Sequence, residues 1–394
     1  MRAIGIVAEY NPFHLGHQYH VRETRRLCPE RAVVAVQSGD FVQRGEAAAY
    51  DKHTRARAAV AGGVDLVVEL PLPWSVASAA AFARGAVGLM GAMGVVDGIS
   101  FGSECGDPVL LDKMACALDQ TETEQAVRMA LRSGCSYAAA RQMALEKTMG
   151  SAAQAIAEPN NILGVEYLRA IKALSLPLRP VTVLRSGAAH DAPADGAVRS
   201  ASEIRQRMER GLSWEAFVPD AAGAVLSRIP RPNRQLLECA QLSRLRMFTA
   251  EQLSGVPDCT EGLENRLYAA LQREETLAQV LERVKTKRYA LSRLRRMLLC
   301  GALGVTGEMS RGVPPYIRVL AADGRGLELL REMRSCASVP VITKPAHGLE
   351  LPGRAGEVFR LTAAARSFYA LAVPGMAPDS DLCTGPHIEK QTAI

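Results

Sequence analysis

The sequence predicts an α/β protein in which a parallel sheet covered by helices is followed by a mostly helical, basic region. Short runs rich in β-branched residues alternate with longer segments of helical periodicity through the first half of the chain. This alternation favours parallel strands with helices on both faces, because each return to the next strand needs a crossover connection. A change to helix-forming, arginine-rich sequence after about residue 215 predicts the second region.

The expected elements follow in chain order. Five strands are predicted from apolar runs bounded by turn residues: IGIVAE at 4–9, AVVAVQSG at 32–39, DLVVELP at 65–71, DGISFG at 97–102 and PVTVLRSG at 180–187. Helices are expected over 17–28, 51–63 and 73–90, and over a long stretch from about 108 to 176. In such a sheet, ligands bind at the carboxyl ends of the strands, where the strand order reverses. The loop that follows the first strand therefore lies where a ligand is expected.

The alternation stops around 218–235, where VPDAAGAVLSRIPRPNRQ is rich in proline and arginine. Beyond it, the chain is helix-rich, with a small strand–helix–strand unit at PYIRVLAADGRGLELLREM and VPVITK. Two regions are therefore expected, 1–215 and 216–394. The final residues, DSDLCTGPHIEKQTAI, are predicted to be a frayed tail.

Composition excludes several protein classes. A chain of 394 residues with 48% hydrophobic and 22% charged residues is typical of a soluble globular protein with two domains. The most apolar segment, WSVASAAAFARGAVGLMGAMGVV, is interrupted by Arg84 and glycines, which favours a packed helix over a membrane span. No signal peptide is expected, because the sequence runs from Met1 directly into a predicted strand, and the nine cysteines form no C-x-x-C pair. We therefore expect a cytoplasmic protein without membrane contacts, structural zinc or a disulfide framework.

Charge is distributed unevenly along the chain, whose formal net charge is +6. Seven Lys and Arg residues lie between Leu281 and Cys300 against one acid, Glu282: Arg283, Lys285, Lys287, Arg288, Arg293, Arg295 and Arg296. A second cluster contains Arg228, Arg231 and Arg234. This asymmetry indicates that a polyanion binds the C-terminal half. The alternative is a solvated helix face.

The stretch GIVAEYNPFHLGHQYHV carries the strongest functional signal. It places an H-x-G-H motif directly after the first strand, and the chain has neither a G-x-x-x-x-G-K-[ST] nor a G-x-G-x-x-G motif. Pro12 stiffens the turn, and Gly16 lets the backbone approach a ligand. His17 is expected at the start of a helix, where free N–H groups favour anions. The two imidazoles can donate hydrogen bonds to phosphate oxygens. The alternative is a pair of surface or metal-bound histidines.

AEYNPFHLGHQYHV resembles the H-x-G-H motif of the nucleotidyltransferase superfamily, which includes class I aminoacyl-tRNA synthetases. It is more closely similar to the tRNA(Met) cytidine acetate ligases. The match continues in order through SGDFVQRGE, VDLVVELP, FGSE, EPNNILG, ASEIR and PYIRVL, so it spans most of the chain. The resemblance implies a Rossmann-like nucleotidyltransferase (HIGH-type) domain over 1–215, which binds ATP and is catalytic, and a tRNA-binding region over 216–394.

The activity implied by this resemblance is activation of acetate with ATP to acetyl-adenylate, with release of pyrophosphate. The acetyl group then passes to N4 of the wobble cytidine of elongator tRNA(Met). ATP is a co-substrate and Mg²⁺ is expected with it, without metal ligands from the protein. Acetate and tRNA are the expected partners, and DNA is not.

The resemblance also implies a set of site residues. His14, His17 and Arg205 are the expected catalytic residues. The nucleotide is expected to contact Val7, Ala8, Glu9, Tyr10, Asn11, Pro12, Phe13, His14, Leu15, Gly16, His17, Gln18, Tyr19 and His20, together with Gly102, Asn160, Asn161, Arg185 and Ser202. A side chain at Gly102 would block the adenosine. The two asparagines and Ser202 are expected to cap helices or to contact the ligand.

Three alternative functions would require other sequence features. A small-molecule nucleotidyltransferase would keep the fold but has no use for the basic C-terminal half. A non-catalytic RNA-binding protein with a vestigial nucleotide site would not need the intact H-x-G-H motif. GISFG at 98–102 fits the G-x-S-x-G nucleophile elbow of hydrolases, but no helix directly follows it. Lys52 and Arg55 are further candidate phosphate or RNA contacts, or part of a solvated helix face.

Overall fold

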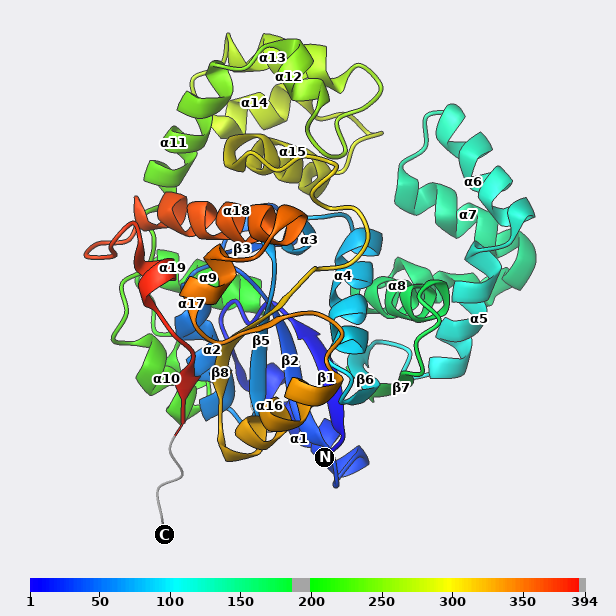
Figure 1. The fold of residues 1–394 in the computed structure, drawn as a ribbon. Helices are drawn as coiled ribbons and strands as arrows, with labels where there is room; N and C mark the ends of the chain where they lie inside the picture. Colours follow the sequence, from blue (N-terminus) through cyan, green and yellow to red (C-terminus); the bar gives the residue numbers. More distant parts are fainter. Residues whose placement is uncertain (186–198, 390–394) are drawn as a thin grey trace.

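A twisted sheet with helices on both faces forms the centre of the molecule in the computed structural model, which describes residues 1–185 and 199–389 (Figure 1). Within the described residues, eight strands form this sheet in the order β10–β8–β5–β2–β1–β6–β7, with β9 paired to β8. The strands are β1 (Ala3–Ala8), β2 (Ala32–Ser38), β5 (Leu66–Leu70), β6 (Val96–Ser103), β7 (Arg179–Leu184), β8 (Ile317–Ala322), β9 (Val341–Ile342) and β10 (His387–Ile388). A short antiparallel hairpin, β3 (Phe41–Val42) and β4 (Glu46–Ala47), follows β2.

The five predicted strands are confirmed as β1, β2, β5, β6 and β7, and all pairs among them are parallel. Every residue of β2 is buried, because helices cover both faces of the sheet. Val34 and Val36 of β2 pack into the core on one face, and Val33 and Ala35 pack into the core on the other. The strand order reverses between β1 and β6, so the predicted ligand position lies at the carboxyl ends of these two strands.

The helices up to residue 176 overlap the predicted segments, but the predicted helix over 73–90 is divided into two helices and the stretch over 108–176 into four α-helices and a 3₁₀ helix. Asp107 caps the helix that begins at Pro108, as expected from sequence. The helices of the first half are α1 (Leu15–Leu27), α2 (Lys52–Ala61), α3 (Leu72–Ser75), α4 (Ala79–Ala92), α5 (Pro108–Leu118), α6 (Thr121–Arg132), α7 (Tyr137–Met149), α8 (Pro159–Ala173) and α9 (Ala201–Glu209), with 3₁₀ helices η1 (Gly150–Ala157) and η2 (Glu215–Phe217).

The C-terminal half is mostly helical, as predicted. Leucines such as Leu245, Leu267 and Leu298 of α11 to α15 form a second core above the sheet in Figure 1, which residues of β3, α3 and α18 share. The helices are α10 (Asp220–Leu226), α11 (Arg234–Arg246), α12 (Ala250–Ser254), α13 (Leu263–Leu271), α14 (Leu277–Val284), α15 (Leu291–Leu303), α16 (Gly324–Cys336), α17 (Pro345–Leu349), α18 (Gly353–Ala370) and α19 (Ser380–Cys383).

The strand–helix–strand unit at β8, α16 and β9 is present but is not separate from the first region. β8 pairs antiparallel with β5, so this unit extends the central sheet. The physical reason is the apolar edge of β5, where Leu66, Val67 and Val68 are fully buried and need a neighbouring strand. Sequence patterns show the strand but not its partner.

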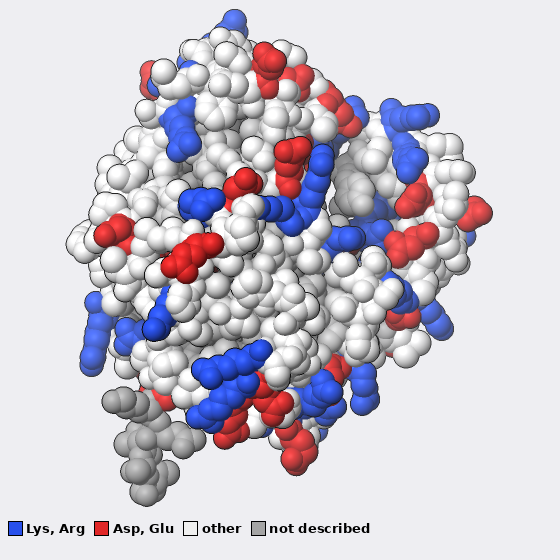
Figure 2. All heavy atoms as spheres, viewed as in Figure 1, with Lys and Arg blue, Asp and Glu red and all other residues white. Residues whose placement is uncertain are grey.

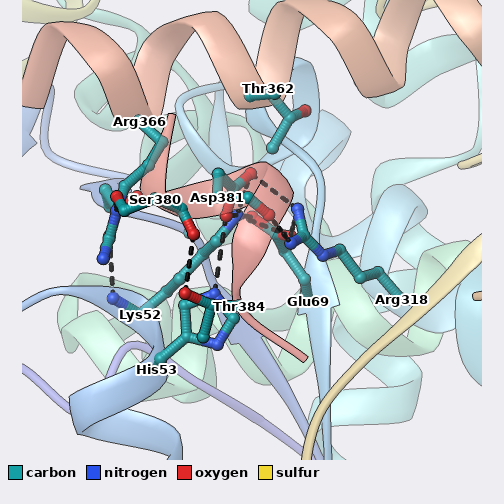
Figure 3. A network of polar contacts seen from close by, with 12 residues as sticks. Lys52, His53, Glu69, Arg318, Thr362, Arg366, Ser380, Asp381 and Thr384 are labelled. Carbon is teal, nitrogen blue, oxygen red and sulfur yellow. Dashed lines mark hydrogen bonds and ion pairs between the residues drawn. The ribbon is translucent and has the colours of Figure 1, made fainter. Parts of the chain in front are cut away.

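The prediction of a frayed C-terminal tail is wrong for residues 379–389, whereas 390–394 lie outside the described residues. β10 pairs with β8, and Asp381 is only 1% exposed. Figure 3 shows the Asp381 carboxylate among side chains from α2, β5 and β8. It lies 2.9 Å from Lys52 Nζ and 2.6 Å from Arg318 Nη1. The tail is therefore fixed by buried charges that lie far apart in sequence.

Lys52, Glu69, Arg318 and Asp381 form a buried cluster with no net charge. Lys52 Nζ also contacts Glu69 Oε1 at 2.8 Å, and all four side chains are at most 3% exposed. The cations depress the pKa of Asp381 well below its usual value despite burial. Removing one member of such a cluster leaves a buried charge without compensation, which costs more than the intact pair contributes.

We predict that Asp381→Asn lowers the free energy of unfolding by about 3–5 kcal/mol, since Lys52 and Arg318 then share one carboxylate. Urea denaturation at pH 7 measures this change. Asp379→Asn, at an exposed position two residues earlier, is the matched control and should change stability by less than about 0.5 kcal/mol. Equal effects of the two substitutions would contradict the role of the cluster.

Candidate functional site

The candidate site lies at the carboxyl ends of β1 and β6. The neighbouring ends of β2 and β5 are filled by the buried charges, and the cavity there, lined by Gly39, Asp40 and Glu69 among others, measures only about 10 Å³. Such a volume holds at most one water molecule. A ligand is therefore directed to the loop between β1 and α1.

His14 and His17 form a reciprocal cap at the start of α1. His14 is the N-cap residue, and its Nδ1 accepts a hydrogen bond from Gly16 N at 3.0 Å. Nδ1 of His17 accepts from His14 N at 3.3 Å. The two rings stack with centroids 3.8 Å apart. Because each Nδ1 is an acceptor, the neutral rings carry their protons on Nε2, and both Nε2–H groups remain as donors for a ligand.

Both imidazoles are neutral at pH 7. Burial lowers the pKa of His14 to about 3, and the positive charges of Arg185 and Arg205 add to this effect. Burial also lowers the pKa of His17 well below its usual value, and the adjacent His14 imidazole and the positive charge of Arg185 add to this effect. The pKa of His20 falls to about 4 for similar reasons. The histidines therefore supply hydrogen bonds, and the arginines supply the positive charge.

Aromatic packing fixes the loop that carries the motif. Tyr10 adopts a left-handed conformation with φ of 47°, and its ring lies edge-on to Phe13 and His17 at 5.0 Å in each case. Phe13 is fully buried against Gly62, where a Cβ atom would come within 2.3 Å of the ring. Asn11 Oδ1 accepts a hydrogen bond from Ala49 N at 2.7 Å. These ring contacts, with the contacts to Gly62 and Ala49, hold the loop in place without a ligand.

Arg205 is brought to the motif from α9. Its Nη1 donates to Asn11 O at 2.8 Å, and its Nη2 donates to Ser202 Oγ at 3.2 Å. The expectation that Ser202 caps the helix is wrong. Ser200 is the cap residue and accepts from Glu203 N, because α9 begins at Ala201. Ser202 instead holds the Arg205 guanidinium beside the loop.

The two asparagines of EPNNILG lie inside the first turn of α8, so the expectation that they cap it is also wrong. Glu104 has this role from the end of β6, and its carboxylate accepts from Asn160 N at 3.3 Å and Asn161 N at 2.9 Å. Asn161 is buried, and its Oδ1 accepts from Ser103 Oγ and Glu104 N. The sequence contains Glu104 in FGSE, but its spacing from α8 gives no sign of this contact.

Gly102 lies near the end of β6, beside Arg185. A Cβ atom at Gly102 would approach Arg185 Cδ to 2.6 Å. Arg185 follows β7, and its backbone N–H donates to Ser103 O at 2.8 Å. The glycine therefore leaves room for the arginine side chain at the β6–β7 edge of the site. The proposed contact of Gly102 with adenosine stays a prediction.

Lys52 and Arg55 are neither phosphate contacts nor a solvated face, because both side chains are fully buried. Lys52 belongs to the cluster around Asp381. The Arg55 guanidinium donates to backbone carbonyls of Glu9, Gly39, Ser38 and Tyr50. It therefore joins the carboxyl ends of β1 and β2 and positions the loop. No spacing in the sequence distinguishes such an arginine from a surface one.

Ser100 is not a nucleophile, in agreement with the sequence argument. It lies in the middle of β6 and is buried. Its Oγ is 2.7 Å from Thr24 Oγ1 and 3.0 Å from His20 Nε2, so it links α1 to the sheet. A nucleophile elbow requires an exposed serine on a strand-to-helix turn.

The basic run between 281 and 300 is divided between buried and exposed positions. Arg296 is 8% exposed and pairs with Asp258, so it is not available to a polyanion. Lys285, Lys287 and Arg288 are exposed in the loop between α14 and α15. Figure 2 shows both Lys or Arg and Asp or Glu side chains on the face between the upper helices and α5–α8.

Residues 1–185 and 199–389 contain no group of three or more His, Cys, Asp or Glu side chains that could hold a metal ion. None of the helices in this part of the chain is long and apolar enough to cross a membrane.

We predict that His14 makes stability depend on pH. The folded state keeps His14 neutral, whereas the unfolded chain protonates it below about pH 6.5, so the free energy of unfolding falls as the pH drops through this value. Between pH 7 and pH 5, wild type should lose about 1–2 kcal/mol more than His14→Gln, as measured by urea denaturation. The same pH dependence in both proteins would show that His14 titrates normally.

Comparisons with known proteins agree with this geometry. The model of the HIGH Nucleotidyl Transferase family matches residues 1–381. The chain is 35% identical to the tRNA(Met) cytidine acetate ligase of Clostridium kluyveri, over 98% of this chain and 99% of the relative. It is 38% identical to that of Syntrophotalea carbinolica, over 87% and 85%.

A solved structure gives the same result. The crystal structure of Thermotoga maritima TmcAL bound with alpha-thio ATP superposes with a TM-score of 0.90 at 30% identity, covering 99% of this chain and all of that one. The chain therefore belongs to the tRNA(Met) cytidine acetate ligase family of HIGH nucleotidyl transferases.

Proposed function

We propose that this protein activates acetate with ATP and transfers the acetyl group to N4 of the wobble cytidine of elongator tRNA(Met). The observation that carries the proposal is the pair of neutral Nε2–H donors at the start of α1, next to Arg185 and Arg205. The names of the relatives support it, as does the alpha-thio ATP bound to Thermotoga maritima TmcAL.

The first step needs no nucleophile from the enzyme. An acetate oxygen attacks the α-phosphorus of ATP. The bond between the α-phosphorus and the oxygen that bridges it to the β-phosphate breaks, and pyrophosphate leaves with the electron pair. His14 and His17 donate hydrogen bonds to phosphate oxygens, and Arg185 and Arg205 offset the charge that develops. The fixed loop keeps these donors in place, so little reorganisation accompanies the reaction.

The second step transfers the acetyl group. N4 of the cytidine attacks the carbonyl carbon of acetyl-adenylate, the bond from this carbon to the AMP oxygen breaks, and the amine releases a proton. The target base must enter the same crevice, and RNA bases are modified when they are unstacked. A tRNA substrate would place the reaction in the cytoplasm.

Mg²⁺ is proposed to arrive with ATP. Magnesium in phosphoryl-transfer sites is held by substrate phosphates and one or two carboxylates, and it does not need a cage of protein ligands. Mg²⁺ would supply charge neutralisation at the phosphates.

The proposed division of labour places ATP activation in residues 1–215 and tRNA binding in 216–394. The exposed cations Lys285, Lys287 and Arg288 support the second part. The alternative of a small-molecule nucleotidyltransferase has no role for these positions.

We predict that His14→Ala or His17→Ala slows adenylation by roughly 10²–10³-fold, the scale of losing one donor to a developing charge. ATP affinity should fall much less, because the donors act chiefly on the transition state. ATP–pyrophosphate exchange with acetate measures the first quantity, and equilibrium ATP binding measures the second. If a chelator removed a transition metal from the pure protein and abolished its activity, His14 and His17 would instead be metal ligands.

Acetate labelled on both oxygens with ¹⁸O tests the adenylate mechanism directly. One labelled oxygen should appear in the released AMP, because the acetate oxygen that attacks phosphorus stays with it when the acetyl group leaves. Mass spectrometry of AMP after one round of tRNA acetylation gives the answer. Unlabelled AMP, or full activity with acetyl-CoA and no ATP, would rule the mechanism out.

A further inference from the structure

A polar cavity of about 260 Å³ lies beside the proposed catalytic site. Every described residue that lines it is polar or charged, and four of them are arginines: Arg44, Arg205, Arg234 and Arg295. Arg205 connects the cavity to the H-x-G-H loop, because its Nη1 donates to Asn11 O at 2.8 Å. A ligand in the cavity would therefore lie beside the segment that carries the H-x-G-H motif.

The walls of the cavity come from both regions of the chain. Arg44 belongs to the β3–β4 hairpin and Arg205 to α9, whereas Arg234 begins α11 and Arg295 lies in α15. The cavity thus occupies the junction between the sheet and the helices above it. This is where an RNA held by the C-terminal helices would reach the catalytic loop.

The cations in the cavity exceed the acids. Glu46 bridges two arginines, with Oε1 at 2.5 Å from Arg295 Nη1 and Oε2 at 3.4 Å from Arg234 Nη2. Arg234 also pairs with Glu209. Arg44 is exposed and makes no ion pair with any residue in the described part of the chain. Four guanidinium groups thus face two carboxylates, which leaves a positive charge for an anionic ligand.

The size of the cavity and the chemistry of its lining residues restrict the class of ligand that it can bind. The volume of about 260 Å³ is slightly below that of typical small-molecule sites, which span roughly 300–1,000 Å³. No aromatic side chain among the described residues lines the cavity, so these residues provide no aromatic ring on which a base could stack. The carboxylates of Glu46 and Glu209 disfavour a highly charged triphosphate. A singly charged phosphodiester with its ribose suits these properties, since guanidinium groups bind phosphate in a bidentate manner.

We propose that this cavity binds a backbone phosphodiester of the acceptor RNA beside the cytidine to be acetylated, with Glu46 holding Arg234 and Arg295 in place until the phosphate arrives. The inference rests on the proposed function, because it specifies how the tRNA acceptor is positioned. It adds Arg44, Arg234 and Arg295 as RNA-positioning residues that act after adenylation.

The test compares two activities and one affinity in Arg44→Ala and Arg234→Ala. The Kd for a tRNA(Met) transcript, measured by filter binding, should rise about tenfold, and the slope of log Kd against log salt should fall by about one unit for each lost contact. Acetate-dependent ATP–pyrophosphate exchange should stay within about twofold of wild type, because adenylation does not use the RNA. Acetyl transfer at low tRNA concentration should fall with the affinity.

Arg334→Ala is the matched control, since Arg334 is exposed on α16, which lies at the opposite end of the sheet from the upper helices. Glu46→Gln supplies a change in the other direction: releasing two arginines should tighten tRNA binding at least twofold. Unchanged tRNA affinity in both arginine variants would overturn the proposal. A loss of ATP–pyrophosphate exchange in these variants would also overturn it, because the cavity would then bind ATP. If the wild-type protein binds tRNA but never acetylates it, the proposed function is wrong. The filter-binding result still shows whether the cavity binds RNA.

Discussion

Four buried side chains, whose charges sum to zero, hold the first region and the last third of this chain together in one sheet. Lys52 and Glu69 come from the first region, and Arg318 and Asp381 from the last third of the sequence. A buried ion needs an opposite charge at close range. Replacing any one of these residues with a neutral one would therefore leave a buried partner without charge compensation. The cluster therefore requires β8 and the C-terminal segment to be in place beside β5. It also makes the division into two regions incomplete, since the chain returns to the sheet after the helical part.

The same cluster shapes the functional site by exclusion. It fills the carboxyl ends of β2 and β5, where an open α/β sheet could otherwise accept a ligand, and leaves the ends of β1 and β6. Arg55 then joins the ends of β1 and β2 through backbone carbonyls, and Tyr10 and Phe13 fix the loop from below. Backbone and aromatic contacts hold His14 and His17 with their Nε2–H groups available. A site built this way has its donors oriented before ATP arrives.

Neutral histidines with nearby arginines give the site two separate properties. Burial keeps the imidazoles uncharged, so they provide directional hydrogen bonds. Arg185 and Arg205 provide charge from other segments of the chain. Arg205 also borders the polar cavity that reaches α11 and α15, so one residue lies between the nucleotide loop and the region proposed for RNA. This position links activation of acetate and positioning of the acceptor in space.

Local patterns in the chain were enough to locate most elements and the principal motif. Periodicity identified the five strands of the first region and the helix beginning at Pro108, because alternation and capping are local properties. The H-x-G-H loop was equally readable, since strand, turn and helix start follow one another within a few residues. Which distant side chains meet was visible only in the folded molecule. Glu104, and not an asparagine, caps α8; Arg55 and Lys52 are buried; and Asp381 anchors a segment that has the composition of a frayed tail. Burial and pairing depend on neighbours brought from other parts of the chain, and a linear pattern of residue types carries no record of them.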